Sequence, residues 1–130
     1  KDKINLLDVD HSAVDWNGKK QKDTSGEENT IAIPGFEKVT LYANETTQAV
    51  NFHNPEINDC YFKISLIHPD GSVLWISDLI EPGKGMYSIE LEKTLAVGEY
   101  ENAVLKYECF SLNDQSPLNG SEINLKLVVV

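Results

Sequence analysis

The sequence predicts an all-β fold: an immunoglobulin- or fibronectin-III-like antiparallel β-sandwich of about seven strands, with a barrel as the alternative. Two observations predict it. No apolar pattern with the helical period of about 3.6 residues extends over a useful length, and turn-forming residues recur about every eight to twelve residues. The 130 residues suit one domain, which we expect at 31–130 behind a flexible leader at 1–30.

The leader has two parts of different composition. Residues 1–16 mix acids with scattered apolar side chains, a pattern too short and irregular for a helix or a strand, and two alternatives are open: they dock on the domain or they stay free. Residues 17–30 contain no Val, Ile, Leu, Met or aromatic residue, so they cannot offset the entropy of ordering and are expected to be mobile. The chain starts at Lys1 rather than Met, which suggests that something upstream was removed: a signal peptide or membrane anchor is one candidate, and a sequence trimmed at this point is the alternative.

Alternation of apolar and polar residues predicts the strands. In the strand at 86–92, Tyr87, Ile89 and Leu91 are expected to face inward. The expected strands are a short edge piece at 31–36, then 37–43, 48–53, 60–67, 72–78, 86–92, 98–110 and a closing strand after the polar loop 111–120. The inward residues of the strand at 60–67 and of the closing strand are Cys60, Phe62, Ile64 and Leu66, and Ile123, Leu125, Leu127 and Val129.

The connections predict how the strands assemble. A polar turn at 44–47 predicts a hairpin between 37–43 and 48–53, whereas the polar segment 54–59 is too long for a tight turn and predicts a crossing between sheets. Residues 68–71 have the Pro and Gly positions of a type I turn. By analogy with known sandwiches, one sheet contains the strands near 37, 47 and 86, and the other those near 60, 72, 98 and 121.

The strand at 98–110 is the central element. Tyr100 begins one apolar face, but the face continued by Ala103 and Leu105 is out of phase with it by one residue. A strand with a two-residue period cannot change phase without an inserted residue, so we place a β-bulge at Glu101–Asn102. Gly98 followed by an inward Tyr100 resembles the corner that opens strand F of immunoglobulin-like sandwiches.

The net charge of −10 is concentrated in residues 23–130, which carry 17 acids against 6 lysines. The chain contains no arginine, so it lacks the bidentate donor used for phosphate and guanine, and its field repels polyanions. We therefore do not expect nucleic acid to be a partner. The acidity favours solubility at a crowded surface over a calcium site or a cationic ligand.

No catalytic, metal or cofactor site is predicted, and the protein is not expected to be an enzyme. Asp8 and Asp10 have the spacing of the first EF-hand ligands, but Ala13 and Lys19 stand where that loop needs Gly and Glu. The motifs of nucleophilic hydrolases, zinc proteases and phosphate loops are absent. The histidines fall on separate segments and are expected to be ordinary surface or edge residues: His11, His53 and His68.

Two sets of residues remain as candidates. Aromatic side chains could form a sugar-stacking platform, although Trp75, between two apolar residues, is more naturally a core residue. The aromatic candidates are Trp16, Tyr61 and Trp75. Cys60 and Cys109 fall on the core faces of two central strands, at ends that lie side by side in an antiparallel pair, and we predict a disulfide between them; two buried reduced thiols are the alternative.

Several spaced segments resemble those of a group of small secreted proteins from gut Firmicutes and their relatives, some of them carried on conjugative transposons. The resemblance covers about residues 13–130, and its segments are 14–18, 31–36, 51–55, 58–62, 79–83, 98–102 and 118–120. It implies export behind a signal peptide or lipid anchor, a β-sandwich, and a role at the cell surface. It implies no catalytic residues.

The expected function is that of a non-enzymatic immunoglobulin-like domain, extracellular or anchored to the cell envelope, that contacts an envelope protein. Any attachment to a membrane is expected only through a removed upstream anchor. The alternative is a carbohydrate-binding module that uses exposed aromatic side chains, and a hydrolase is the third hypothesis, which would need a concave pocket with converging carboxylates or an activated nucleophile.

Overall fold

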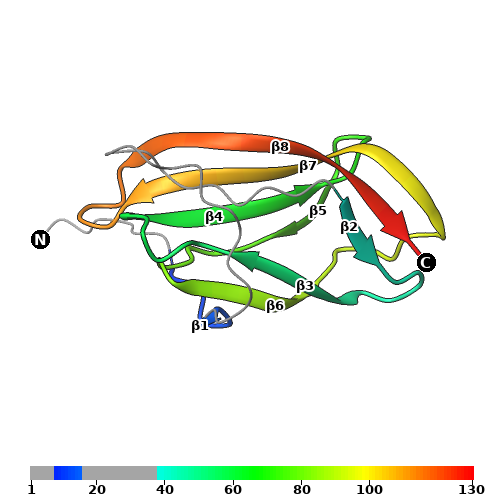
Figure 1. The fold of residues 1–130 in the computed structure, drawn as a ribbon, viewed down its shortest axis with the longest axis horizontal. Helices are drawn as coiled ribbons and strands as arrows, with labels where there is room; N and C mark the ends of the chain where they lie inside the picture. The colour runs from blue at the N-terminus through cyan, green and yellow to red at the C-terminus, as the bar shows by residue number, and fades with distance from the viewer. Residues whose placement is uncertain (1–7, 16–37) are drawn as a thin grey trace, which may run out of the picture.

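The computed structural model describes residues 8–15 and 38–130, and in this part of the chain it is all-β (Figure 1). The described residues form eight strands and no helix, so none of them provides an apolar helix that could cross a membrane. The strands are β1 Val14–Asp15, β2 Lys38–Leu41, β3 Thr47–His53, β4 Cys60–Ile67, β5 Val73–Ile76, β6 Lys84–Glu90, β7 Gly98–Ser111 and β8 Pro117–Val129. The predicted all-β class is confirmed.

The strands form two sheets. The larger has five strands in the order β2-β8-β7-β4-β5, and the smaller has three in the order β1-β6-β3. Neighbouring strands are antiparallel except β2 and β8, which run parallel with Lys38 opposite Lys126. The sheets are also joined directly, because the backbone N–H of Glu92, after β6, donates to the carbonyl of Leu74 in β5. The segment 54–59 crosses from one sheet to the other, as predicted.

The predicted hairpin between 37–43 and 48–53 is wrong, because β2 and β3 belong to different sheets. The buried side chain of Gln48 explains the difference. Its amide donates to the carbonyls of Tyr42 and Glu45, both at 2.8 Å, and accepts from the Tyr42 backbone N–H at 2.9 Å. These bonds occupy backbone groups at the turn that a hairpin partner would have used, and β2 pairs with β8 instead.

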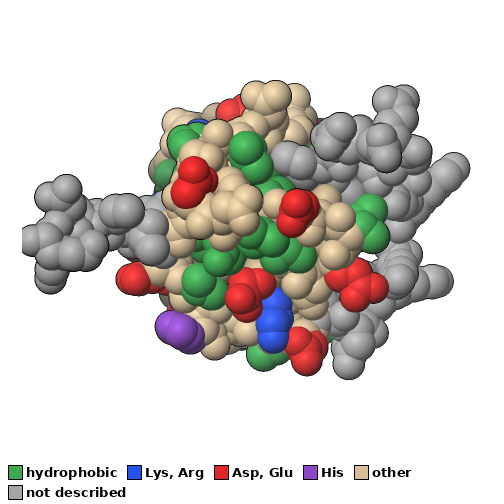
Figure 2. Space-filling view, turned by 90° about the vertical axis from the view of Figure 1, so that its left-hand side faces the viewer, with side chains coloured by type: hydrophobic (Ala, Val, Ile, Leu, Met, Phe, Trp, Pro, Cys, Tyr) green, Lys and Arg blue, Asp and Glu red, His purple; other side chains and the backbone are tan. Residues whose placement is uncertain are grey.

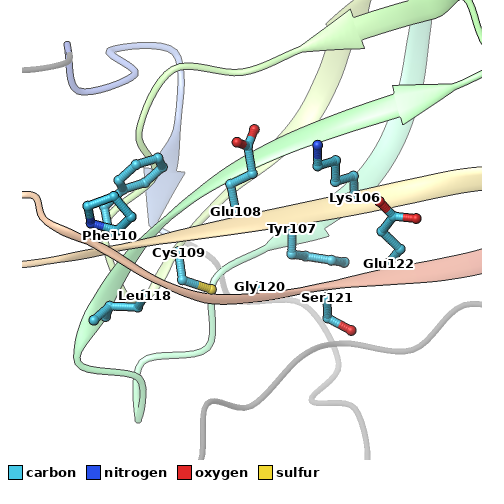
Figure 3. Close-up of a pocket in the computed structure, with 10 residues that line it drawn as sticks. Lys106, Tyr107, Glu108, Cys109, Phe110, Leu118, Gly120, Ser121 and Glu122 are labelled. Atoms are coloured by element: carbon cyan, nitrogen blue, oxygen red, sulfur yellow. The ribbon is translucent and has the colours of Figure 1, made fainter.

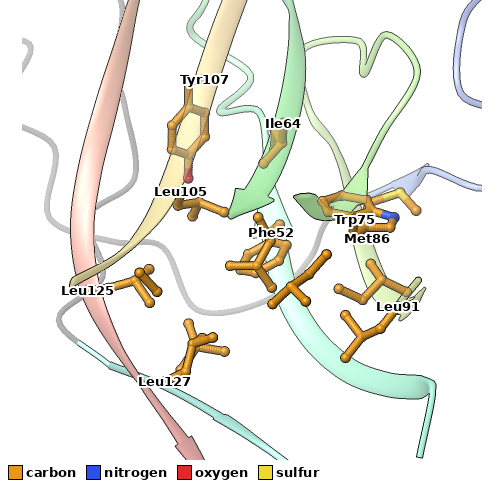
Figure 4. Close-up of a cluster of buried hydrophobic side chains, with 14 of the residues drawn as sticks. Phe52, Ile64, Trp75, Met86, Leu91, Leu105, Tyr107, Leu125 and Leu127 are labelled. Carbon is orange, nitrogen blue, oxygen red and sulfur yellow. The ribbon is translucent and has the colours of Figure 1, made fainter. Parts of the chain in front are cut away.

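One apolar core lies between the sheets, and Figure 4 shows side chains of both converging in it. The predicted inward faces of β4 and β8 are buried, apart from Ile123, which is half-buried. Phe62 packs edge-on against Tyr107 with ring centroids 5.2 Å apart, within the large sheet. The ring centroids of Phe52, in the small sheet, and Trp75, in the large sheet, are 5.7 Å apart. Aromatic contacts of this kind contribute beyond the area they bury.

The predicted inward face of β6 is partly wrong. Ile89 and Leu91 are buried as expected, but Met86 faces the core and Tyr87 is exposed. The β3–β6 pairing shifts register between Ala49 and Phe52, where β3 contains one residue more than β6. The strict two-residue alternation on which the prediction depended does not hold in this part of the sheet.

The β-bulge predicted in β7 is confirmed. Tyr100 lies opposite Leu127 and Ala103 opposite Leu125, so β7 contains one residue more than β8 across this interval. Asn102 has a φ of +66°, a left-handed conformation that Asn tolerates better than most residues. The Tyr100 hydroxyl donates to the carbonyl of Ala96 at 2.8 Å and ties the start of β7 to the preceding loop.

A second irregularity made β8 start earlier than predicted. The β7–β8 register shifts again between Tyr107 and Cys109, and β8 begins at Pro117, inside the expected loop 111–120. Gly120 lies at this shift. A Cβ atom there would be 2.2 Å from the Tyr107 carbonyl oxygen, so only glycine allows the two backbones this approach.

Part of the predicted flexible leader is docked on the domain. β1 pairs with the start of β6, with Val14 opposite Gly85, and Val9 bridges Leu79 in parallel. Within the leader expected at 1–30, residues 8–15 therefore take the docked alternative. The predicted mobile segment 17–30 and the expected edge piece at 31–36 lie outside the described residues.

We predict that Tyr100→Phe lowers the free energy of unfolding by about 1 kcal/mol, because it removes the hydroxyl that donates to Ala96. Tyr42→Phe is the matched control, since Tyr42 is 54% exposed, and we expect a change within about 0.5 kcal/mol. Urea unfolding followed by tryptophan fluorescence measures both. Equal effects of the two substitutions would contradict a structural role for the Tyr100 hydroxyl.

Candidate functional site

The clearest candidate surface is one end of the molecule, at the left in Figure 1, where four segments distant in the sequence meet. We call it the loop end. Figure 2 views it face on, and apolar side chains gather near its middle with acidic side chains around them. The segments are 8–15, 54–59, 77–84 and 111–118.

The apolar part of the loop end comes from side chains that point out of the core. Ile57, in the crossing between β3 and β4, is 60% exposed. Leu118, in the β7–β8 hairpin, is 42% exposed, and Leu112 and Val14 are also exposed. Isolated apolar side chains are normal on a protein surface, but a contiguous group rimmed by polar residues is typical of an interaction site.

The charge of the described residues is distributed unevenly. The loop end contains eight acids and one lysine, whereas the other described residues contain eight acids and five lysines. Seven of the ten net negative charges of the described residues therefore lie at the loop end. The lysine, Lys84, pairs with Asp15 at 2.7 Å. The acids are Asp8, Asp10, Asp15, Glu56, Asp59, Asp78, Glu81 and Asp114.

A buried amide holds two of these loops together. The Asn54 side chain donates to the carbonyls of Cys60 at 2.8 Å and Ile80 at 2.9 Å, and it accepts from the side-chain amide of Asn58 at 2.9 Å. The Asn54 backbone adds two bonds to the loop before β6: its N–H donates to Lys84, and its carbonyl accepts from Gly83. The crossing 54–59 is thereby fixed to the segment 77–84.

The docked leader segment is fixed by Asp10. One Asp10 carboxylate oxygen accepts from the Ser12 backbone N–H at 3.0 Å, and the other accepts from the Asp78 N–H at 3.1 Å. The Asp10 backbone N–H donates to the Leu79 carbonyl at 2.6 Å. Asp10 thus forms hydrogen bonds with the backbone of its own segment, 8–15, and of the neighbouring segment, 77–84. In the described part of the chain, no three His, Cys, Asp or Glu side chains are grouped to hold a metal ion.

The three histidines lie in different environments. His11 is exposed at the loop end, as predicted, and His68 is half-buried at the opposite end, where it contacts Tyr100 and Asp70. His53 lies on β3, an edge strand of the small sheet, but its side chain is buried next to Asn54 rather than at the surface. Burial lowers the pKa of His53 to about 4, because the charged imidazolium loses its hydration there.

The aromatic candidates do not form a platform in the described structure. Trp75 is only 6% exposed and packs against Phe52, so it belongs to the core. Tyr61 is half-buried on the outer face of β4, opposite Phe110. Trp16 lies outside the described residues. The carbohydrate-binding hypothesis thus loses Trp75, its candidate in the middle of the domain.

Cys60 and Cys109 lie on the core faces of neighbouring strands, as predicted. They are free thiols in this structure and hydrogen-bond to each other, and this contact, together with burial, raises the pKa of the Cys109 thiol. Cys109 is opposite Phe62, so the cysteines are diagonal neighbours. The Cα atoms of such diagonal neighbours are typically about 7–8 Å apart, more than the Cα separation of a disulfide. Forming the disulfide would therefore require a local shift of the backbone. Its formation stays a prediction.

A shallow pocket of about 370 Å³ lies over the second register shift of β7 and β8 (Figure 3). Its lining includes the charged side chains Lys106, Glu108 and Glu122, together with the open backbone at Gly120. Tyr107 and Cys109 also line it, but both are nearly inaccessible. The lining also includes the hydroxyl of Ser121, but no histidine that could activate it. The hydrolase hypothesis stays a prediction.

Comparison with known proteins gives no match: no protein-family model, no curated protein and no solved structure is similar to this chain.

Sequence reasoning did not identify the loop end, because its four segments are joined only by the fold. Two local features pointed to it. Ile57 is an isolated large apolar residue in an otherwise polar loop, and Leu112 stands in the same way after β7. An apolar residue in a polar connection has no strand face to occupy, so its exposure could have been expected.

We predict that Asn54→Ala lowers the free energy of unfolding by about 2–5 kcal/mol, because it leaves the buried carbonyls of Cys60 and Ile80 without this donor. The control is Asn124→Ala, at an exposed position on the outer face of β8, where we expect a change within about 0.5 kcal/mol. Chemical denaturation measures both. A loss no larger than that of the control would show that the amide does not hold the loops.

We also predict a pH dependence that belongs to His53. Its pKa is about 4 in the folded protein and near 6.5 when unfolded, so its contribution to stability is complete above pH 6.5 and is lost as the pH falls toward 4. One pKa unit corresponds to about 1.4 kcal/mol, so the loss by pH 4.5 is roughly 2–3 kcal/mol.

Denaturation of the unmodified protein and of His53→Gln at pH 7 and pH 4.5 measures this effect. The drop between the two pH values should be smaller in His53→Gln, whatever its stability at pH 7. The exposed His11 supplies the control, and His11→Gln should keep the full drop. An unchanged drop in His53→Gln would contradict the assignment.

Proposed function

We propose that this protein is a non-catalytic, immunoglobulin-like interaction domain that contacts a protein partner at the cell envelope through its loop end. The topology supports the fold assignment. β3 and β6 pair in one sheet as strands B and E do, and β4, β7 and β8 are adjacent in the other as strands C, F and G are. The hydroxyl of Tyr100 bonds to Ala96 as a tyrosine corner does.

The chain departs from antibody-type domains in its cysteines. There the conserved disulfide joins strands B and F across the two sheets. Here Cys60 and Cys109 both belong to the large sheet. The correspondence thus concerns strand order and the tyrosine corner, and the packing of Phe52 on Trp75 provides the contact between the sheets.

The loop end corresponds to the end of an immunoglobulin variable domain that carries its recognition loops. The crossing 54–59 stands where the B–C loop is, and the hairpin connection 112–116 stands where the F–G loop is. Loops on a rigid sheet scaffold are a common place for recognition because their side chains can vary without loss of the core.

One observation carries the proposal: exposed apolar side chains lie on loops whose backbones are fixed. Ile57 projects from a crossing that Asn54 ties to the neighbouring loop through buried hydrogen bonds. A fixed apolar surface with a polar rim resembles the centre and margin of protein–protein interfaces. The envelope location is supported by the resemblance to small secreted proteins described above.

We predict that the double variant Ile57→Ser, Leu112→Ser loses capture of a protein partner from an envelope extract, because it removes two apolar anchors. The matched control, Tyr42→Ser, Val97→Ser, removes two exposed apolar residues from the opposite end, where Val97 is 70% exposed. Cross-linking followed by mass spectrometry identifies what the unmodified protein and both variants capture.

Thermal unfolding establishes that both variants are folded before capture is compared. The proposal expects one protein that is captured by the unmodified chain and the control and is lost with the loop-end variant. Equal capture by both variants would place the contact elsewhere, and capture of a polysaccharide without protein would favour the carbohydrate alternative.

A further inference from the structure

Building on the proposed function, we propose that the partner presents a basic segment with interspersed apolar side chains to the loop end. The apolar side chains would contact Ile57 and its exposed neighbours, and the lysines or arginines would face the surrounding carboxylates.

Charge complementarity is the first argument. The loop end carries seven of the ten net negative charges of the described residues, and its lysine is already paired with Asp15. On the outer face of the large sheet, by contrast, charges of opposite sign are close together: Lys126 pairs with Glu99 at 3.1 Å and Glu101 at 3.3 Å. A basic partner is therefore attracted to one end of the molecule.

The arrangement of apolar and acidic side chains is the second argument. Glu56 and Asp59 flank Ile57 in the same loop, and Asp114 follows Leu112 in the next, so each anchor has carboxylates beside it. All of these side chains are exposed. Figure 2 shows the acids around the apolar group rather than on one side of it. An isolated cation would use the acids alone, whereas a basic segment with apolar residues would use both.

Fixed loops are the third argument. Binding that must order a loop pays for that ordering out of its affinity. The bonds from the Asn54 amide to Cys60 and Ile80, and from the Asp78 backbone N–H to the Asp10 carboxylate, are made within the chain itself. The surface is thus formed before binding, and the side chains of the anchors are the main groups left to order.

The test uses fluorescently labelled peptides and the full chain. The probe consists of repeated Lys-Leu-Ser triplets, and two comparison peptides replace either every lysine by glutamate or every leucine by serine. Fluorescence anisotropy should show binding of the Lys-Leu-Ser peptide, weaker binding of the peptide without leucine, and none of the acidic peptide. Raising the salt concentration should weaken the binding, since exposed charges are screened.

Two charge-matched variants locate the contact. Glu56→Gln, Asp59→Asn, Glu81→Gln removes three carboxylates from the loop end, and Glu45→Gln, Glu92→Gln, Glu122→Gln removes three exposed carboxylates elsewhere. At the small energies typical of exposed ion pairs, we expect the loop-end variant to bind about tenfold more weakly and the control to bind within about twofold of the unmodified protein.

Each outcome decides the matter. Selective weakening in the loop-end variant supports the inference. Equal weakening in both variants shows that only the net charge acts, and no binding of the Lys-Leu-Ser peptide shows that the partner is not basic; either result overturns it. The proposed function is judged separately, because capture from an extract that depends on Ile57 and Leu112 would stand even if the peptide failed to bind.

Discussion

Asn54 lies where the chain leaves the small sheet and enters the large one, and its side chain joins the two. It donates to Cys60 at the start of β4 and to Ile80 in the loop that leads to β6, while its backbone bonds to Lys84. Buried polar groups are costly unless each is satisfied, so a buried amide with all these partners fixes one arrangement of the crossing. The position of the crossing 54–59 relative to the segment 77–84 depends on these bonds.

This constraint separates the scaffold from the surface. The bonds that fix the crossing come from backbone groups and from the inward side chains of Asn54 and Asn58. The side chains of Glu56, Ile57 and Asp59, in the same crossing, are exposed. Ile57 is 60% exposed between two acids, where a polar side chain would be better solvated. Its presence is explained more simply by contact with another molecule than by stability.

The sequence was most informative where one face of a strand is buried along its whole length. Alternation predicted the inward faces of β4 and β8, and the change of phase after Tyr100 predicted the bulge in β7. A one-residue slip would bury the wrong side chains, so burial on one face determines register strongly. This is why the inward faces of β4 and β8 and the bulge in β7 could be predicted from the sequence.

The errors have a common cause: hydrogen bonds between segments far apart in the sequence, or bonds made by one side chain, replaced the local pattern. Gln48 occupies the backbone groups of the turn and prevents the hairpin. The close approach of Gly120 to Tyr107 lets β8 start early, and Asp10 docks a segment of low local propensity. The loop end combines four such segments, so it could be found only once the strands had been placed.

The location of the acidic residues can be separated from their number. Solubility requires a net charge but not a particular place for it, and an even distribution minimises self-repulsion within the folded protein. Concentrating carboxylates at one end increases that repulsion while adding nothing to solubility. Some of these acids have partners in the fold: Asp10 accepts from Asp78, Asp15 pairs with Lys84, and Asp114 accepts from Ser116. Most of the eight are nevertheless exposed, so a partner can reach them, and the apolar side chains between them indicate where it would bind.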